Sequence, residues 1–125
     1  MLLIPSSLLR LCMAAAQSAH PNESLLLLHG HRDGPDVRLE GASVPPGLSV
    51  ARSSAAFLPW MVPSGTDYIG VFHSHPSGGP HPSGADLFLA SKEGGVQLLL
   101  AAPYTPERLV AYDPQGRSLV FRIVP

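Results

Sequence analysis

A strand, a Gly/Pro-rich loop and a helix follow one another in the second half of the sequence, and this order constrains the fold most. The apolar run Tyr68–His75 predicts a buried strand, which Pro76 ends because proline has no N–H to give to a sheet. Residues 76–82 form the loop, and we expect a helix from Ser83 to about Glu93. The pair Gly94-Gly95 then supplies a typical helix end, so this segment indicates an α/β domain.

A second helix is expected near the start of the chain, where apolar residues recur at helical spacing. Pro5 can occupy the helix start, and Ser6 or Ser7 can cap it. Arg10 lies inside the apolar stretch, which argues against a secretory signal peptide over Met1–Ala19. The expected buried face consists of Leu8, Leu9, Cys12, Ala15, Ala16 and Ala19.

Strands outnumber helices in the hydrophobic pattern, which predicts a mixed central sheet flanked by helices. Residues 48–65 fit either a short helix over Arg52–Phe57 or an irregular excursion. The remaining strands are expected at Ser24–His31, Val37–Val44, Val96–Ala102, Leu109–Tyr112 and Ser118–Val124, with a turn at Asp113–Gly116 before the last of them.

The composition limits the functions open to this chain. Its 125 residues are 45% hydrophobic, which suits one domain over residues 1–125 with a single core. Only 14% of the residues are charged and the formal net charge is -1, which argues against a nucleic-acid-binding surface. No apolar run reaches the roughly 18 residues of a membrane span. We therefore expect a cytoplasmic protein that binds no nucleic acid or membrane, and whose low charge is compatible with a homodimer.

Histidine is unusually frequent in this short chain, with six residues against a single cysteine, and this frequency needs a chemical explanation. His73 and His75 lie two apart on the expected strand, so their side chains point to the same face. Asp86 lies in the first turn of the helix that follows the loop. Two imidazoles and one carboxylate are a common set of zinc ligands that leaves a fourth position open, as catalytic sites do.

Each part of this pattern also has an ordinary structural explanation. A His-x-His pair on a strand can be a core or surface feature, and Ser83 with Asp86 three residues later is a helix-capping pattern. The two explanations are compatible, because a cap can orient Asp86 toward a metal. The combination favours a metal site.

The complete spacing is His-x-His, seven residues, Ser, two residues and Asp. It resembles the motif of the JAMM metalloproteases, also called MPN+ or JAB-domain proteins. That family has a glutamate upstream in a Pro-x-Glu pattern before an apolar run and Gly, which Pro21, Glu23 and Gly30 match here. The resemblance covers nearly the whole chain, is closest to the short prokaryotic form, and implies an MPN domain of cytidine-deaminase-like fold.

The resemblance also implies a role for each motif residue. His73, His75 and Asp86 would bind one zinc ion per chain. Glu23 would act as general base and then general acid on the zinc-bound water that serves as nucleophile. Ser83 would donate a hydrogen bond to the oxyanion of the tetrahedral intermediate.

Several residues lie outside this pattern. Ser24 and Leu25 replace the small or cysteine residues of many relatives, so local packing can differ. His81 lies in the loop but at no position of the motif. It can be an exposed surface residue, contact one of the metal-ligating residues, or take part in substrate recognition. His29 and His31 are expected to be structural, while His20, Cys12 and Trp60 are expected to pack or lie at the surface.

The expected activity is therefore that of a zinc metallopeptidase or isopeptidase. The resemblance implies cleavage after the C-terminal Gly-Gly of a ubiquitin-like or sulfur-carrier protein, from which either a peptide or an isopeptide partner would be released. A RadC-like JAB-domain protein and a non-catalytic MPN scaffold are the alternatives. A zinc deaminase is excluded, because its Cys-x-x-Cys pair cannot be built from Cys12 alone.

Overall fold

The computed structural model of the chain describes residues 1–45, 49–50, 55–56 and 68–125. In chain order its elements are β1 (Leu2–Pro5), α1 (Ser6–Ala19), β2 (Leu25–Asp33), β3 (Asp36–Ser43), β4 (Ser49–Val50), β5 (Ala55–Ala56), β6 (Gly70–His75), α2 (Gly84–Glu93), β7 (Val96–Ala101), the 3-10 helix η2 (Pro106–Arg108), β8 (Leu109–Tyr112) and β9 (Phe121–Val124).

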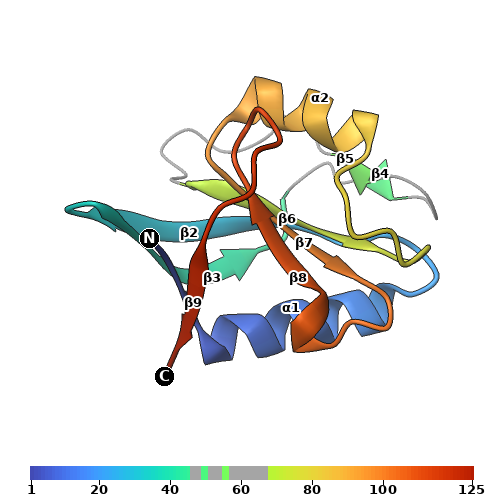
Figure 1. The fold of residues 1–125 in the computed structure, drawn as a ribbon. Helices are drawn as coiled ribbons and strands as arrows, with labels where there is room; N and C mark the ends of the chain where they lie inside the picture. Colours follow the sequence, from blue (N-terminus) through green and yellow to red (C-terminus); the bar gives the residue numbers. More distant parts are fainter. Residues whose placement is uncertain (46–48, 51–54, 57–67) are drawn as a thin grey trace.

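Seven of these strands form one mixed sheet in the order β8-β7-β6-β2-β3-β1-β9. Helices α1 and α2 lie on opposite faces of this sheet (Figure 1). Strands β6 and β7 are parallel, whereas β2 runs antiparallel to both of its neighbours, β6 and β3. The α/β architecture with a mixed sheet and flanking helices, expected from the sequence, is confirmed.

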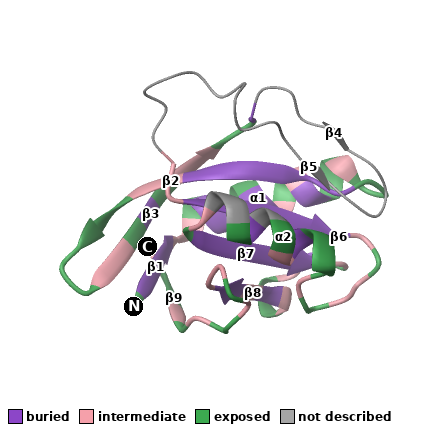
Figure 2. Ribbon diagram, turned by 90° about the horizontal axis from the view of Figure 1, so that it is seen from above, coloured by how far each residue is buried: buried purple, intermediate pink, exposed green. Residues whose placement is uncertain are grey.

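The neighbouring strands β7, β6 and the first half of β2 are covered on both faces, which explains their nearly continuous apolar sequences. All six residues of β6 and all six of β7 are buried, as are the first four of β2 (Figure 2). Successive side chains of β6 point to opposite faces of the sheet. Phe72 packs in the main core with α1, and the residues before and after it face the side of the sheet that α2 covers. The sheet is thus rigid where β6 carries the two motif histidines.

Helix α1 packs against one face of the sheet, and a row of small and apolar side chains on the helix contributes to the main core. Its buried residues are Leu8, Leu9, Cys12 and Ala16, while Ala15 and Ala19 of the expected face are only half-buried. Burial raises the pKa of the Cys12 thiol to about 12, so this cysteine is a packing residue.

The expected start of the first helix was wrong. Residues Leu2–Pro5 form β1, a strand between β3 and β9, and Pro5 occupies the N-cap with no side-chain capping bond. Neither Ser6 nor Ser7 caps the helix, because both already lie within it. The apolar residues of a short strand and of a helix turn look alike in sequence, and here the first four-residue run is buried by sheet neighbours.

The alternative of a helix over Arg52–Phe57 is also wrong for the two residues of that range that the structure describes. Ala55–Ala56 is a strand paired with Ser49–Val50 in a separate two-stranded sheet. The rest of that expectation, and Trp60, lie outside the described residues.

Helix α2 begins as the sequence predicts. The Ser83 hydroxyl accepts from the Asp86 N–H at 3.1 Å, and the Asp86 carboxylate accepts from the Ser83 N–H at 2.9 Å. This reciprocal pair is a capping box, and Gly94, with φ of 71°, ends the helix. The cap fixes Asp86 at the end of the helix nearest β6.

The end of the chain connects the two ends of the sheet. After β8, Ser118 pairs with Tyr112 and the Leu119 N–H donates to the Ala111 carbonyl at 2.8 Å. The chain then crosses to pair β9 in parallel with β1. The expected strand over Ser118–Val124 is therefore divided between the two edges, with regular strand structure from Phe121.

None of the helices in the described ranges has the length and apolar character needed to cross a membrane.

Gly30 is required by the close approach of β2 to β3. The register shifts between His29 and Gly30, which leaves Glu40 of β3 as an extra residue in a bulge. A Cβ added at Gly30 would lie 2.1 Å from the Arg38 carbonyl oxygen, whereas one at Gly41 would meet nothing within 4 Å.

We expect Gly30→Ala to destabilise the protein by about 1–3 kcal/mol, since backbone atoms must move to admit the methyl group. Gly41→Ala on the paired strand is the matched control and should change the free energy of unfolding by less than about 0.5 kcal/mol or increase it. Urea denaturation of both variants measures the difference. Equal stability of the two would show that the β2–β3 approach does not require glycine.

Candidate metal centre

Strand β6 and the chain just before β2 bring His73, His75 and Glu23 to one place. The two histidines are two residues apart on β6, so both face the side of the sheet covered by α2. Leu25 of β2 pairs with His73, and the Ser74 N–H donates to the Ser24 carbonyl at 3.1 Å. The same antiparallel register sets Glu23 opposite His75.

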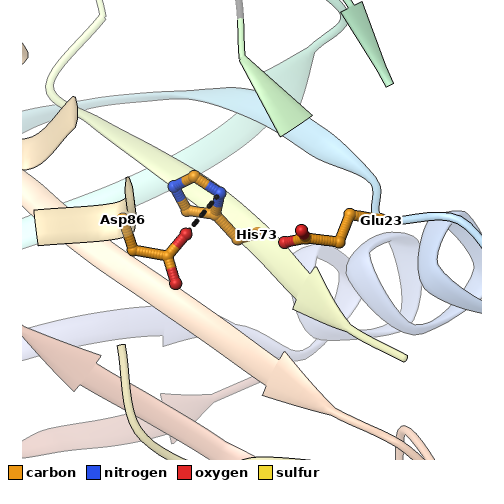
Figure 3. A group of neighbouring side chains, drawn as sticks. All are labelled: Glu23, His73 and Asp86. Carbon is orange, nitrogen blue, oxygen red and sulfur yellow. Dashed lines mark ion pairs between the residues drawn. The ribbon is translucent and has the colours of Figure 1, made fainter. Parts of the chain in front are cut away.

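Asp86 reaches this group from the first turn of α2. Figure 3 shows the side chains of Asp86 and Glu23 on either side of His73. One ligand atom from each of Glu23, His73 and Asp86 lies within 4.8 Å of the other two. His75 joins them, with Nε2 at 2.6 Å from Asp86 Oδ2 and 3.9 Å from Glu23 Oε1. All four expected residues therefore converge.

Two members of the group have buried polar atoms without hydrogen-bond partners in the described structure. These atoms are Glu23 Oε1 and both ring nitrogens of His73, and His73 Nδ1 lies 3.5 Å from Asp86 Oδ1. Glu23 and His73 are only 2% and 1% exposed. Because buried polar atoms are normally paired, these atoms fit a ligand that the protein alone does not supply.

His75 is oriented by the loop that follows β6. Its Nδ1 lies 3.0 Å from the Gly79 carbonyl, a pure acceptor, so Nδ1 carries a proton. Nε2 then faces Asp86 Oδ2, which accepts from the Ser83 N–H as well. With a neutral ring, two acceptors would face each other at 2.6 Å, so a shared proton must lie between them.

The electrostatics of the group follow from burial and from the two carboxylates. Burial, with the charge of Asp86 added, raises the pKa of Glu23 to about 7. Burial also raises the pKa of Asp86, but hydrogen bonds from His75 and from the Ser83 N–H, with the charge of His75, outweigh burial and lower this pKa to about 2. Burial lowers the pKa of His73, which leaves this ring neutral and able to act as a ligand.

The pKa of His75 responds in the opposite direction from that of His73. Burial lowers it, but the hydrogen bonds to Asp86 and Gly79 outweigh burial and raise it. Without a metal, His75 and Asp86 therefore form a buried ion pair. A divalent cation can replace the shared proton, because a neutral imidazole nitrogen and a carboxylate oxygen are both zinc ligands.

A cleft of about 510 Å³ opens beside this group. Its lining residues are His20, Pro21, Glu23, His75, Pro76, Ser77, Gly79, His81 and Ser83. The Ser83 hydroxyl accepts from the Asp86 N–H and keeps its own proton free to donate into the cleft. Glu23, His75 and Ser83 are thus accessible to a molecule bound there.

Sequence reasoning missed part of the cleft wall. His20 lies at the surface, as one of the two expectations for it had it, and it also lines the cleft, with its Nδ1 2.8 Å from the Tyr104 hydroxyl. Its position three residues before Glu23 was the available signal. His81, for which several roles were open, also lines the cleft.

The two remaining histidines lie on the β2–β3 hairpin. His29 is hydrogen-bonded to Ser43 at 2.6 Å, and His31 to Glu40. Both have structural partners on β3, as expected.

Comparisons with known proteins identify relatives of this chain. Residues 5–114 match the family model of prokaryotic homologs of the JAB domain. A protein from Haloferax volcanii, named a probable metalloprotease, is 32% identical over 121 residues, which cover 90% of this chain and 73% of that protein.

Solved structures of similar fold extend over essentially the whole chain. One, described as a JAMM metalloprotease-like zinc site in the proteasome and signalosome, has a TM-score of 0.75 at 27% identity and covers 100% of this chain and 99% of its own. A JAB1/MPN domain protein from Archaeoglobus fulgidus has a TM-score of 0.71 at 29% identity, with 100% of both chains covered. A Desulfitobacterium hafniense protein shares the fold, with a TM-score of 0.78 at 24% identity over 99% and 93% of the two chains. The chain therefore belongs to the JAMM/MPN family, as one of the prokaryotic homologs of the JAB domain.

Proposed function

We propose that this protein is a zinc-dependent peptidase or isopeptidase that acts after the C-terminal Gly-Gly of a ubiquitin-like or sulfur-carrier protein. Family membership and a relative named a probable metalloprotease support the coarser description, a zinc hydrolase of the JAMM type. The observation that carries the proposal is the convergence of Glu23, His73, His75 and Asp86 beside a cleft.

His73, His75 and Asp86 would hold one zinc ion per chain. The donor set fits, because both His73 nitrogens lack a hydrogen-bond partner in the described structure and His75 Nε2 shares with Asp86 a proton that a cation can replace. Bound zinc supplies a Lewis acid that polarises a carbonyl group and lowers the pKa of a water molecule. The Gly79 carbonyl would keep His75 Nε2 directed at the site through its bond to Nδ1.

Glu23 would move the proton of the reaction. It lies beside the proposed ligands without coordinating in this assignment, and its raised pKa of about 7 suits a group that must accept a proton and return it near neutral pH. Glu23 would first take a proton from the attacking water and later deliver it to the leaving amine. Ser83 would donate its free hydroxyl proton to the substrate carbonyl oxygen as negative charge develops there.

The described part of the cleft suits a substrate without bulky side chains at the scissile bond. The loop after β6 contributes Pro76, Ser77, Gly79 and His81 to the wall, and these are short or polar residues. Among the described lining residues the apolar contribution comes from Pro21 and Pro76, with no larger apolar side chain. A Gly-Gly tail requires only backbone recognition and would fit such a wall.

The first prediction from this proposal concerns zinc binding. The purified protein should bind one zinc ion per chain, and His73→Ala or Asp86→Asn should weaken zinc binding at least about 100-fold because each removes a ligand. His31→Gln, at the exposed hairpin, is the matched control and should bind zinc normally. Elemental analysis and competition with a chromophoric chelator measure both quantities. A wild-type protein that takes up no zinc would favour the non-catalytic scaffold.

The second prediction concerns activity. Glu23→Gln should lower kcat for cleavage of a carrier fusion by about 10²–10⁴-fold while retaining zinc, because it removes the proton acceptor and leaves the ligands. Paired substrates, with the Gly-Gly tail joined to a peptide amine or to a lysine side chain, measure the bond preference. Undiminished cleavage by Glu23→Gln and in the presence of chelator would contradict metalloprotease action. Equal cleavage of an Ala-Ala tail would contradict only the Gly-Gly assignment.

The third prediction concerns stability of the metal-free protein. Glu23 has a pKa of about 7 when folded against a usual value of 4.5, so the folded state holds a proton that the unfolded state releases between these values. Stability contributed by Glu23 therefore falls as pH rises from 4.5 through 7. Glu23→Gln should raise Tm above that of the wild type at pH 8, and the difference should vanish near pH 4. A constant difference across this range would show that the Glu23 carboxyl is not buried.

A further inference from the structure

Two buried serines fasten the chain that carries Glu23 to the strand that carries the histidines. Ser74 lies between His73 and His75 and is 0% exposed, and Ser24 directly follows Glu23 and is 8% exposed. The Ser74 hydroxyl accepts from the Ser24 N–H at 2.8 Å, and the Ser24 hydroxyl lies 3.1 Å from it. We call these two residues the serine clasp.

The clasp alters the last step of the ladder between β2 and β6. In a regular antiparallel ladder, a hydrogen-bonded pair exchanges two N–H···O=C bonds. The Ser74 N–H makes one of them, to the Ser24 carbonyl at 3.1 Å, but the return bond from the Ser24 N–H goes to the Ser74 hydroxyl. The backbone next to Glu23 is therefore held by a side chain, and its placement depends on that hydroxyl.

The clasp lies on the face of the sheet opposite the candidate metal centre. Alternation along β6 directs Ser74 to the side of α1, away from His73 and His75. Ser74 cannot reach a substrate in the cleft, and it is absent from the cleft lining. Any influence on the reaction must therefore act through its neighbours, either along β6 through His73 and His75 or across the ladder through Ser24 and Glu23. Unchanged zinc affinity in a Ser74 variant distinguishes the second route from the first.

We propose that Ser74 is a positioning residue for Glu23, whose hydroxyl sets the distance between the Glu23 carboxylate and the histidine ligands. This inference rests on the proposed function, since it assigns Glu23 its proton-transfer role. Glu23 Oε1 lies 3.9 Å from His75 Nε2, and reactions of this kind lose up to about 100-fold when a reacting group shifts by 1 Å. Without the hydroxyl, the Ser24 N–H loses its acceptor, and the backbone next to Glu23 is no longer held at this point.

Three substitutions separate this role from general stability. Ser74→Ala removes the hydroxyl that accepts from Ser24, Ser74→Thr retains a hydroxyl, and Ser91→Ala removes an exposed serine of α2 whose hydroxyl bonds only within its own helix, to Phe88. Amide hydrogen exchange at Ser24 reports the clasp without any substrate or metal. We expect exchange about 10-fold faster in Ser74→Ala, with wild-type rates in Ser74→Thr and Ser91→Ala.

The kinetic arm compares kcat and KM of the zinc-loaded variants on the carrier fusion. Ser74→Ala should lower kcat by about 10–100-fold with KM and zinc content unchanged, and Ser74→Thr should restore at least part of the loss. A merely structural role would lower Tm and leave kcat per folded, zinc-loaded molecule unchanged. That result, or an unchanged Ser24 exchange rate in Ser74→Ala, would overturn the proposal.

A structural arm keeps this inference distinguishable from the proposed function. In a crystal structure of Ser74→Ala, Glu23 Oε1 should no longer lie 3.9 Å from His75 Nε2, while His73 and His75 keep their positions. Ser91→Ala should match the wild type. A displaced Glu23 carboxylate with faster Ser24 exchange supports the positioning role even if the wild type cleaves no carrier fusion, in which case only the proposed activity fails. An unmoved Glu23 carboxylate in Ser74→Ala overturns the positioning role.

Discussion

The structure depends on one electrostatic constraint, the burial of two carboxylates and two imidazoles at the end of β6. Glu23 and Asp86 cannot both be ionised in such a site without positive charge nearby, because desolvation and mutual repulsion oppose it. In this structure His75 Nε2 contacts the Asp86 carboxylate, and the Ser83 N–H of the helix cap donates a hydrogen bond to it. A divalent cation would neutralise both carboxylates and would also bind one of the His73 ring nitrogens that lack a hydrogen-bond partner in the described structure. Protein stability and metal affinity are therefore coupled through the same few atoms.

Much of this site could be predicted from the sequence, because local rules determine it. Alternation along a strand places His73 and His75 on one face, and the Ser-x-x-Asp pattern caps the following helix and brings Asp86 to its first turn. The family resemblance added Glu23, which local rules alone would have left as an ordinary turn residue. The central strands were recognisable because burial on both faces gives an uninterrupted apolar sequence. Apart from Glu23, the evidence in each case lay within a few neighbouring residues.

The remainder depends on contacts between distant segments, for which single-sequence patterns carry no information. Nothing in residues 1–5 distinguishes a strand from a first helical turn, and only the neighbours β3 and β9 decide it. The Gly79 carbonyl that orients His75 is a backbone atom and has no residue preference. The Ser74 hydroxyl that holds Ser24 looks like any small residue between two histidines until the register of β2 against β6 is known. His20 similarly gains meaning only through Tyr104, which lies 84 positions away in the chain.

The crossing of the C-terminal segment has a consequence for how this sheet avoids self-association. An exposed strand edge is a template for pairing with another chain, and a mixed sheet of this size ordinarily leaves one at each end. Here Ser118 and Leu119 cover part of the β8 edge, while β9 covers that of β1. At the second end β9 itself becomes the edge strand, since no further strand pairs with it in the described residues. A protein with so few charged residues has little electrostatic protection against aggregation, and the edge that remains is limited to four residues that include the exposed Arg122.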